Sequence, residues 1–479
     1  MEEQTEFDPQ ESVAGSQRFG GSFRDPAGYV FQRDDRIFRA VRSDWIEVYR
    51  QLRSEESWPQ LAQLLVETDS VNDAELTADL KHEHPGYQHF LEHRRLWPIT
   101  YPYEWSISML ADAALLTLDL QRQLIGAGYS LKDATAYNVQ FSGGRPLFID
   151  LTSIERPKRL DLWPALGQFS QMFTYPLMLA VHCGWDLRSY FQSNLSGLNV
   201  ERVAKAIGFA KRIRPGFWLD VTIPNLLSGR KRTKSLDANE LLEQANPDPR
   251  PQELNLGRLR GKIASLARQH RPAGHWVEYA STCTYDEHGN QQKQQLVEAF
   301  LQAQRPNTVL DLGCNTGTYS LLAARCGAKV IAVDQDPDVV DSLYRHLANE
   351  PCEITPLVID LSNPSPAIGF CNQERPAFLE RARCECVLAL ALVHHLLVTG
   401  NLSIPAVRDL LAGLTTRLLV VEYVGPDDPM YAELCKRRVG TTDPLTLENF
   451  VEVFSARFET LERHPLPNGR ILLMMRKLG

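Results

Sequence analysis

The run Val309-Leu-Asp-Leu-Gly-Cys-Asn-Thr-Gly317 joins a short apolar segment to a glycine-containing loop. Glycines such as Gly313 and Gly317 let a strand turn sharply into a helix, and they leave room for a ligand where a Cβ would collide with it. The residues that follow, 318–326, have the pattern of a helix. The run therefore predicts a buried strand, a ligand-binding turn and a helix.

Strands and helices alternate on both sides of this turn. Strands are expected at 329–334, 353–360, 386–392, 417–424, 458–464 and 470–477, and helices at 291–304, from Pro337, at 404–413 and at 445–454. Regular alternation predicts a parallel, doubly wound sheet. The last two strands are joined only by Pro-Leu-Pro-Asn-Gly, which is too short for a crossover helix, so that pair is expected to be antiparallel.

Acidic residues stand at the ends of three successive predicted strands. Asp311 lies in the first, Asp334 ends the second about 20 residues past the glycines, and Asp360 ends the third. Ligands of open α/β sheets bind at the carboxyl ends of the strands. A phosphate at the turn would be repelled by Asp311, whereas a positively charged adenosine ligand without phosphate would be attracted. Asp334 or Asp360 alone could equally cap a helix or a turn.

This pattern resembles class I S-adenosylmethionine-dependent methyltransferases over residues 275–479. The resemblance implies an α/β fold with a Rossmann-like seven-stranded sheet that ends in an antiparallel hairpin, and S-adenosylmethionine as cofactor. It places Asp311, Gly313 and Gly317 at the amino-acid end of the cofactor, Asp334 at the ribose and Asp360 at the adenine. The residues expected beside them are Cys314, Asn315, Gln335 and Leu361.

Two further features bear on this assignment. A dinucleotide dehydrogenase, the main competitor, prefers a third glycine where this chain has Ser320, and it leaves Asp311 unexplained. Upstream, Tyr285 and Lys293 belong to an aromatic and basic segment that also contains Trp276 and Tyr279. Such a segment can close over the methionine end of the cofactor, or it can pack its aromatics into a domain interface.

Candidate catalytic residues follow the fourth and fifth predicted strands. His394 and His395 lie at the edge that faces the methyl group in this fold, and either could act as a general base because imidazole titrates near neutral pH. A structural histidine beneath the loop is the alternative for each, and one of the two is expected to face inward. Glu422 and Tyr423 border the same cleft as acceptor-side candidates. Asp427 and Asp428 follow in a loop that either forms a solvated turn or reaches the acceptor.

The N-terminal half contains a second constellation. Asp133 and Asn138 form an Asp-x4-Asn pair, and a short hairpin then leads to Asp150. This order resembles the catalytic loop and metal-binding strand of the protein-kinase and aminoglycoside-phosphotransferase fold. The resemblance implies Asp133 as catalytic base and Asn138 and Asp150 as magnesium ligands.

The flanking sequence both supports that resemblance and departs from it. A long helical pattern at 105–127 precedes the constellation, and 28–41 fits the remnant of a small strand-rich lobe. Leu131 stands where kinases place histidine, however, and no glycine-rich phosphate loop is evident. Arg39 is the nearest substitute for the strand lysine. We therefore interpret this half as a degenerate α+β, kinase-like scaffold that orients substrate, with a coincidental loop as the alternative.

Length and composition limit the remaining possibilities. A chain of 479 residues predicts two or three domains, which we expect as a flexible acidic tail at 1–20, a kinase-like domain at 21–200, a mostly helical connector at 201–274 and the methyltransferase domain at 275–479. A net charge of -8 argues against a generally basic nucleic-acid binder. The apolar runs are too short to span a membrane, and the nine cysteines lack metal-ligand spacing. We expect a cytoplasmic protein without a metal site.

As a whole, the chain resembles bacterial two-part methyltransferases, including nodulation-type proteins, in which Tyr-Pro-Tyr-Glu-Trp-Ser and Lys-Asp-Ala-Thr-Ala-Tyr-Asn precede the glycine-rich domain. The first hypothesis is methyl transfer to a hydroxyl or amine of a small molecule or saccharide. The second is a regulatory fusion of a degenerate kinase and a methyltransferase-like sensor that binds nucleotide without turnover. The third is an RNA or protein methyltransferase, with the basic run 228–235 for docking. Neither the acceptor nor the oligomeric state follows from the sequence.

Overall fold

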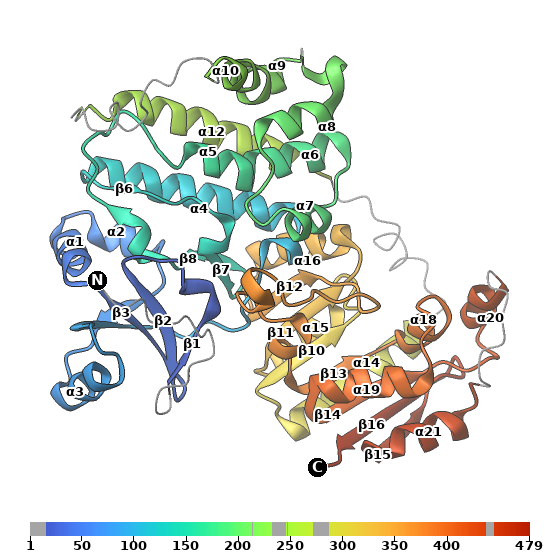
Figure 1. Ribbon diagram of the computed structural model, residues 1–479. Helices are drawn as coiled ribbons and strands as arrows, with labels where there is room; N and C mark the ends of the chain where they lie inside the picture. Colours follow the sequence, from blue (N-terminus) through green and yellow to red (C-terminus); the bar gives the residue numbers. More distant parts are fainter. Residues whose placement is uncertain (1–15, 213, 232–245, 247, 272–286, 437–444) are drawn as a thin grey trace.

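The protein folds into two halves that pack against each other (Figure 1). The structure is a computed structural model and describes residues 16–212, 214–231, 246, 248–271, 287–436 and 445–479. Helices and a small sheet form the N-terminal half, and a larger sheet covered by helices forms the C-terminal half. Within the described ranges, no helix combines the length and apolar character that crossing a lipid bilayer requires.

The C-terminal half is built on a seven-stranded sheet with the order β12-β11-β10-β13-β14-β16-β15. Its strands are β10 (Thr308–Leu312), β11 (Lys329–Asp334), β12 (Ile354–Val358), β13 (Cys384–Ala389), β14 (Thr415–Tyr423), β15 (Phe458–Pro465) and β16 (Ile471–Lys477). The first five strands of that order are parallel, and β16 pairs antiparallel with both of its neighbours. The central strands β10 and β13 are buried on both faces, as in sheets covered by helices on each side. The predicted parallel sheet with an antiparallel end is confirmed.

Helices follow the strands as expected. They are α14 (Glu287–Gln304), α15 (Thr318–Arg325), α16 (Pro337–Asn349), η7 (Phe370–Asn372), α17 (Phe378–Arg381), α18 (Val393–Val398), α19 (Ile404–Leu414), α20 (Pro429–Lys436) and α21 (Leu447–Ser455). The start of α16 shows why a helix forms there, because Asp336 caps the backbone N–H of Asp338 and Pro337 occupies the first turn. Its buried face then packs on the sheet.

A five-stranded antiparallel sheet opens the N-terminal half, with the order β1-β2-β3-β5-β4. The strands are β1 (Ser16–Arg18), β2 (Gly28–Arg33), β3 (Arg36–Val41), β4 (Thr68–Ser70) and β5 (His89–His93), accompanied by η1 (Gly20–Ser22), α1 (Ser43–Ser54), α2 (Trp58–Ala62) and α3 (Ala74–Glu83). The small strand-rich lobe expected at 28–41 is therefore present. The prediction of a flexible tail at 1–20 is wrong for residues 16–18, because they form β1 and pair with β2.

The rest of this half is mainly helical. The predicted long helix is α4 (Ile107–Gly126), after η2 (Pro102–Glu104). Short elements follow: β6 (Ser130–Leu131), η3 (Ala136–Asn138), β7 (Val139–Ser142), β8 (Arg145–Phe148), η4 (Leu151–Ser153) and β9 (Ile154–Glu155). The last helices are α5 (Leu166–Phe169), η5 (Ser170–Thr174), α6 (Tyr175–Cys183), α7 (Leu187–Ser193), α8 (Val200–Arg212), α9 (Pro215–Phe217), η6 (Trp218–Thr222), α10 (Ile223–Lys231) and α12 (Arg250–Gln269). Helix α12 has Pro251 in its first turn, where proline is tolerated because its missing N–H would have no partner within the helix.

The two halves meet through buried polar contacts as well as a shared hydrophobic core. Asp341 of α16 is fully buried and accepts hydrogen bonds from the backbone N–H of Ser108, at 2.8 Å, and from its hydroxyl, at 3.0 Å. Arg381 of α17 forms an ion pair of 2.5 Å with Glu104, which is also buried. A carboxylate from one half thus satisfies one of the orphan N–H groups at the start of α4 in the other half.

Candidate cofactor site

The loop between β10 and α15 is tied to the neighbouring strand through its backbone. The N–H groups of Gly313 and Cys314 both donate to the carbonyl of Val333, at 2.8 and 2.9 Å. Gly317 has φ of +87°, and a Cβ at this position would lie 2.5 Å from Leu343 Cδ1. Only glycine therefore fits between this loop and α16.

Cys314 and Asn315 lie in the same loop but contribute differently. The Cys314 side chain is buried, and burial raises the pKa of its thiol well above the ordinary value. Asn315 has a positive φ of 48°, and its backbone N–H points to Asp334. The thiol is therefore a packing group, while the loop can offer its backbone to a ligand.

Asp334 ends β11 and is held by two backbone groups. Its Oδ2 accepts from the N–H of Asn315 and its Oδ1 from the N–H of Asp336, both at 3.0 Å. Burial raises the pKa of Asp334 above its ordinary value. The turn-capping role considered from the sequence is thus real, but an ionised carboxylate has about four acceptor sites, so it can still accept ribose hydroxyls. Gln335 is exposed beside it.

Asp311 is more enclosed than the sequence suggested. It is 2% exposed, and Ser320 donates its hydroxyl to Asp311 Oδ2 at 2.6 Å. Burial raises the pKa of Asp311 to about 6. Ser320, which stands where a dehydrogenase prefers glycine, therefore fixes the acid that distinguishes this loop.

Asp360 lies two residues beyond β12 and is half open to solvent. Its Oδ1 accepts from the N–H of Ser362 at 2.8 Å, and its Oδ2 lies 4.0 Å from Nη1 of Arg188 in α7. Leu361 beside it is buried. Sequence reasoning missed Arg188 because it stands 172 residues before Asp360, in the other half of the chain. Tyr285, Trp276 and Tyr279 lie outside the described residues.

The three acids come together at one edge of the sheet. Strands β12, β11 and β10 are adjacent and parallel, with Asp311 opposite Ala332 and Asp334 opposite Val358. Their carboxyl ends therefore bring Asp311, Asp334 and Asp360 to the same side, as predicted. A set of negative side chains beside a glycine loop suits a positively charged ligand better than a pyrophosphate.

A buried network of charged side chains lies at the carboxyl end of β14. Lys293 Nζ is 2.5 Å from Glu422 Oε2, and Arg470 contacts Glu422 Oε1 at 3.2 Å and Asp428 Oδ2 at 2.7 Å. Each of these side chains is at most 6% exposed. Lys293 and Glu422 are thus paired with each other, and Asp428 is buried instead of lying in a solvated turn.

The two histidines differ in their surroundings. His394 is 3% exposed, whereas His395 is only partly buried, so the expected inward and outward placement holds in part. Burial, followed by the charges of His395 and Arg470, lowers the pKa of His394 to about 3. His394 is therefore neutral at physiological pH, and this low pKa makes it a weak base, whereas a general base works best with a pKa near the working pH.

Tyr423, the second acceptor-side candidate, is bound to the backbone in this structure. Its hydroxyl donates to the carbonyl of Leu445 at 2.7 Å, and its ring is buried. It joins the end of β14 to the segment before α21. The sequence could not show this, because the carbonyl partner carries no side-chain signal.

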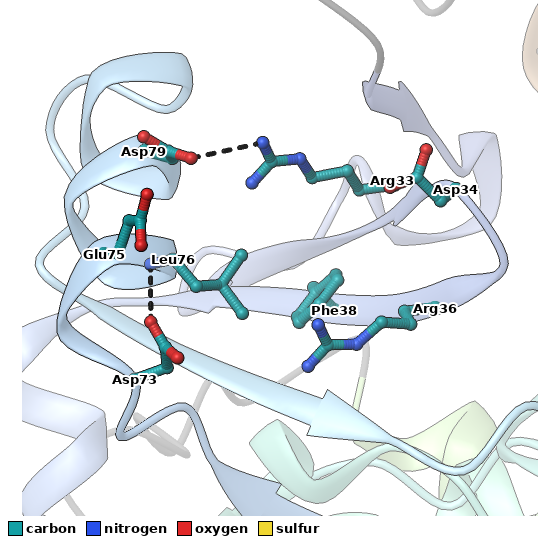
Figure 2. Close-up of a pocket in the computed structure, with 8 residues that line it drawn as sticks. All are labelled: Arg33, Asp34, Arg36, Phe38, Asp73, Glu75, Leu76 and Asp79. Carbon is teal, nitrogen blue, oxygen red and sulfur yellow. Dashed lines mark hydrogen bonds and ion pairs between the residues drawn. The ribbon is translucent and has the colours of Figure 1, made fainter.

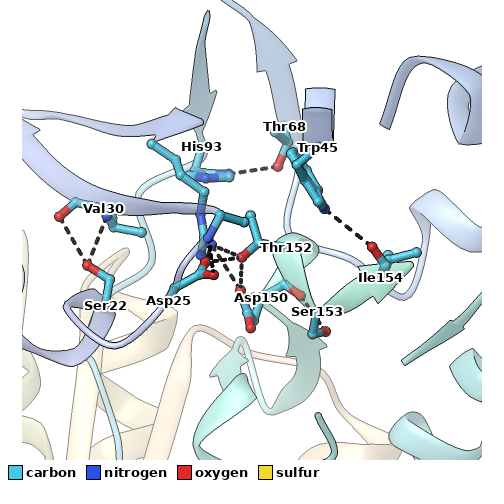
Figure 3. Close-up of polar contacts among 12 residues, drawn as sticks. Ser22, Asp25, Val30, Trp45, Thr68, His93, Asp150, Thr152, Ser153 and Ile154 are labelled. Carbon is cyan, nitrogen blue, oxygen red and sulfur yellow. Dashed lines mark hydrogen bonds and ion pairs between the residues drawn. The ribbon is translucent and has the colours of Figure 1, made fainter. Parts of the chain in front are cut away.

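The Asp133, Asn138 and Asp150 constellation takes the predicted hairpin form, with Asp133 before η3 and Asp150 after β8. Arg39 Nη1 contacts Asp150 Oδ1 at 2.9 Å, near Asp25 and Thr152 (Figure 3). Burial, and then the charge of Asp150, raises the pKa of Asp133. The acid that the resemblance assigns to magnesium, Asp150, is thus paired with an arginine. Among the described residues, no three His, Cys, Asp or Glu side chains are placed to hold a metal ion.

A separate pocket of about 320 Å³ lies between the β2–β3 turn and α3 (Figure 2). Its lining residues are Arg33, Asp34, Arg36, Phe38, Asp73, Glu75, Leu76 and Asp79. Arg33 is paired with Asp79 at 3.4 Å, and Arg36 with Glu92 at 2.6 Å. Since its positive groups are already paired with acids and it lies far from the carboxyl edge of the large sheet, we assign no ligand to it.

Comparisons with known proteins place the chain as follows. No model of a known protein family matches it. The nodulation protein NoeA of Rhizobium meliloti (strain 1021) is 31% identical over 460 residues, which cover 95% of this chain and 94% of NoeA.

Solved structures resemble only part of the chain. Magnesium protoporphyrin IX methyltransferase (ChlM) from Synechocystis PCC 6803 with bound SAH is 17% identical, covers 40% of this chain and 84% of its own, and has a TM-score of 0.30. N-methyltransferase NodS from Bradyrhizobium japonicum WM9 is 13% identical, covers 40% of this chain and 99% of its own, and also has a TM-score of 0.30. ChlM was also solved with SAM. A likeness at this level says nothing of the acceptor.

Proposed function

The chain belongs to the family of the nodulation protein NoeA, and we propose that it is an S-adenosylmethionine-dependent methyltransferase acting on a hydroxyl or amine of a small molecule or saccharide. The carboxylate edge beside the glycine loop carries this proposal. Asp334 is positioned by two backbone N–H groups, and Asp360 lies one strand further along the same edge. Together they offer acceptors to the ribose hydroxyls and the adenine amine of an adenosine ligand.

The catalytic side of the proposal depends on the segment after β13. Leu392 lies 3.3 Å from the position of a Cβ on Gly313, so the chain leading to His394 starts beside the glycine loop. The bound cofactor supplies a methyl group on a sulfonium, which needs no further activation by the protein. The protein has to align the acceptor and take its proton, and His395, the less buried of the two histidines, is the better candidate for the base.

Calorimetric titration with S-adenosylhomocysteine, NAD⁺ and magnesium-ATP tests the proposal. Saturable binding of S-adenosylhomocysteine, without a response to NAD⁺, is the expected result. Binding of NAD⁺ in its place would contradict the proposal, because a pyrophosphate would then lie at the glycine loop. Turnover that depends on added RNA and falls steeply with salt would instead support an RNA methyltransferase.

We expect the affinity for S-adenosylhomocysteine to fall as the pH drops below about 6. The raised pKa of Asp311 means that this acid is ionised above that pH and neutral below it. The ammonium of the ligand stays charged in this range, so its attraction to Asp311 is lost on acidification, by at most about tenfold per pH unit. Titrations between pH 5 and pH 8 measure the effect. In Asp311→Asn we expect weaker binding with a flatter pH profile, and an unchanged profile would show that another group is responsible.

For residues 21–200, we propose a degenerate kinase-like scaffold without phosphoryl transfer. The support is the paired β6 and β9, the β7–β8 hairpin, and the ion pair of Arg39 with Asp150, which occupies the acid that would hold magnesium. We expect magnesium-ATP to leave the midpoint of thermal unfolding unchanged in the wild type. A stabilisation that is lost in Asp150→Ala would favour the nucleotide-binding regulatory fusion instead.

A further inference from the structure

The segment 363–376 follows Asp360 and forms a folded loop on the adenine side of the site. Ile368 and Arg375 exchange two backbone hydrogen bonds of 3.1 Å, which close the loop on itself. We call this segment the adenine-side loop. It belongs to the C-terminal half, yet the contacts that hold it come mostly from the N-terminal half.

Residues before β2 in the N-terminal half contact residues 370–374 of the adenine-side loop. Arg24 forms an ion pair of 2.5 Å with Glu374, whose side chain is 7% exposed. The rings of Phe23 and Phe370 lie 5.6 Å apart between centroids. These contacts join positions about 350 residues apart in the sequence, so they form only when the two halves are docked.

Two further contacts join the N-terminal half to the adenine-side loop. A Cβ on Gly20 would lie 2.3 Å from the carbonyl oxygen of Gln373, so the backbones touch here and only glycine fits. The guanidinium of Arg375 stacks over the ring of Tyr137 at 3.9 Å. Tyr137 lies between Asp133 and Asn138, so the adenine-side loop covers part of the constellation that resembles a kinase catalytic loop.

Arg188 contacts both the adenine-side loop and the candidate cofactor site. Asp186 caps the first turn of α7, where it accepts from the backbone N–H groups of Arg188 and Ser189. The Arg188 side chain is 16% exposed, donates to the carbonyl of Asn363 and lies 4.0 Å from Asp360. It is thus the one described cation that touches both the adenine-side loop and the acid expected at the adenine.

We propose that the N-terminal half is a clamp that orders the adenine side of the cofactor site, and that Arg188 is a positioning residue that acts through Asp360. This inference rests on the proposed function. Ordering a loop costs conformational entropy, and a loop that is ordered before the ligand arrives spares that cost at the binding step. Arg188 also turns the Asp360 carboxylate so that it faces the adenine amine.

Arg188→Ala is expected to weaken S-adenosylhomocysteine binding about 5- to 10-fold in calorimetry, because the hydrogen bond to the Asn363 carbonyl and the ion pair with Asp360 are both lost. The affinity of Arg188→Lys should lie between those of the wild type and Arg188→Ala, since lysine keeps the charge but not the planar guanidinium. Arg202→Ala is the matched control, because this exposed arginine of the same half contacts Asn194 and not the adenine-side loop. Its affinity should equal that of the wild type.

A double-mutant cycle tests whether Arg188 acts through Asp360. If it does, Arg188→Ala/Asp360→Ala binds no more than about twofold more weakly than Asp360→Ala alone. Fully additive losses would overturn the positioning role. Hydrogen exchange without ligand supplies a second readout, in which peptides covering 363–376 should exchange faster in Arg188→Ala than in Arg202→Ala.

The outcomes separate the two levels of the proposal. A wild type that does not bind S-adenosylhomocysteine defeats the proposed function, and the clamp with it. A wild type that binds, together with an Arg188→Ala variant of equal affinity and equal exchange in 363–376, overturns the clamp and leaves the proposed function standing.

Discussion

Asp334→Ala is expected to weaken S-adenosylhomocysteine binding by about 100-fold or more in calorimetry. In the proposed complex this carboxylate accepts both ribose hydroxyls, and hydrogen bonds to a charged group contribute about 1.5–3 kcal/mol each. The substitution also releases the N–H groups of Asn315 and Asp336, which Asp334 now holds at 3.0 Å. Both effects act on the ligand site, so the loss should exceed that of any other single acid at this edge.

The control for this variant is Asp409→Ala. Asp409 lies on α19 of the same half and is paired on the surface with Arg408 at 2.8 Å, away from the glycine loop. Its removal should leave the affinity unchanged. Wild-type affinity in Asp334→Ala, with a normal midpoint of thermal unfolding, would mean that the ribose does not lie at β11 and that the proposed site is wrong.

The C-terminal fold could be predicted because its physical signals are local. Strands covered by helices on both faces read as continuous apolar runs, and 329–334 was expected with the bounds that β11 has. The acids at successive strand ends then followed from parallel pairing alone. Helix ends were less certain, since α14 begins at Glu287, four residues before the expected start.

Elements that depend on distant partners could not be predicted. Strand β1 is Ser-Gln-Arg, which has no apolar alternation, and it forms only because β2 offers a free edge. For the same reason it was assigned to a tail. Asp428 follows a Gly-Pro-Asp sequence typical of a solvated turn, and only its pairing with Arg470, 42 residues later, buries it.

The same limit applies to the candidate site. Asp311, Asp334 and Asp360 could be predicted from strand ends, but Arg188 could not, because its contact with Asp360 needs the docking of two halves. The partner of Lys293 was missed as well, since Glu422 lies on a strand far along the chain. The sequence pattern therefore identifies the side chains at the ends of strands. Tertiary packing then determines which of these side chains remain accessible to a ligand.

Arg470→Ala is expected to lower the free energy of unfolding by about 3–5 kcal/mol. Arg470 is 4% exposed and is shared by two buried acids, Glu422 at 3.2 Å and Asp428 at 2.7 Å. Its removal leaves Asp428 buried without the cation that now faces it, and leaves Glu422 with Lys293 alone. Because Asp428 also caps the start of α20, the loss should loosen that helix.

Chemical denaturation followed by circular dichroism measures this loss, with Arg476→Ala as the matched control. Arg476 lies on β16, the strand that begins directly after Arg470, and pairs with Glu459 at 3.7 Å, but both side chains are 56% exposed. Exposed pairs contribute about 0–1 kcal/mol, so the control should stay close to the wild type. Equal effects of the two substitutions would show that the buried network does not stabilise this end of the sheet, and that burial of Glu422 and Asp428 is tolerated without their cation.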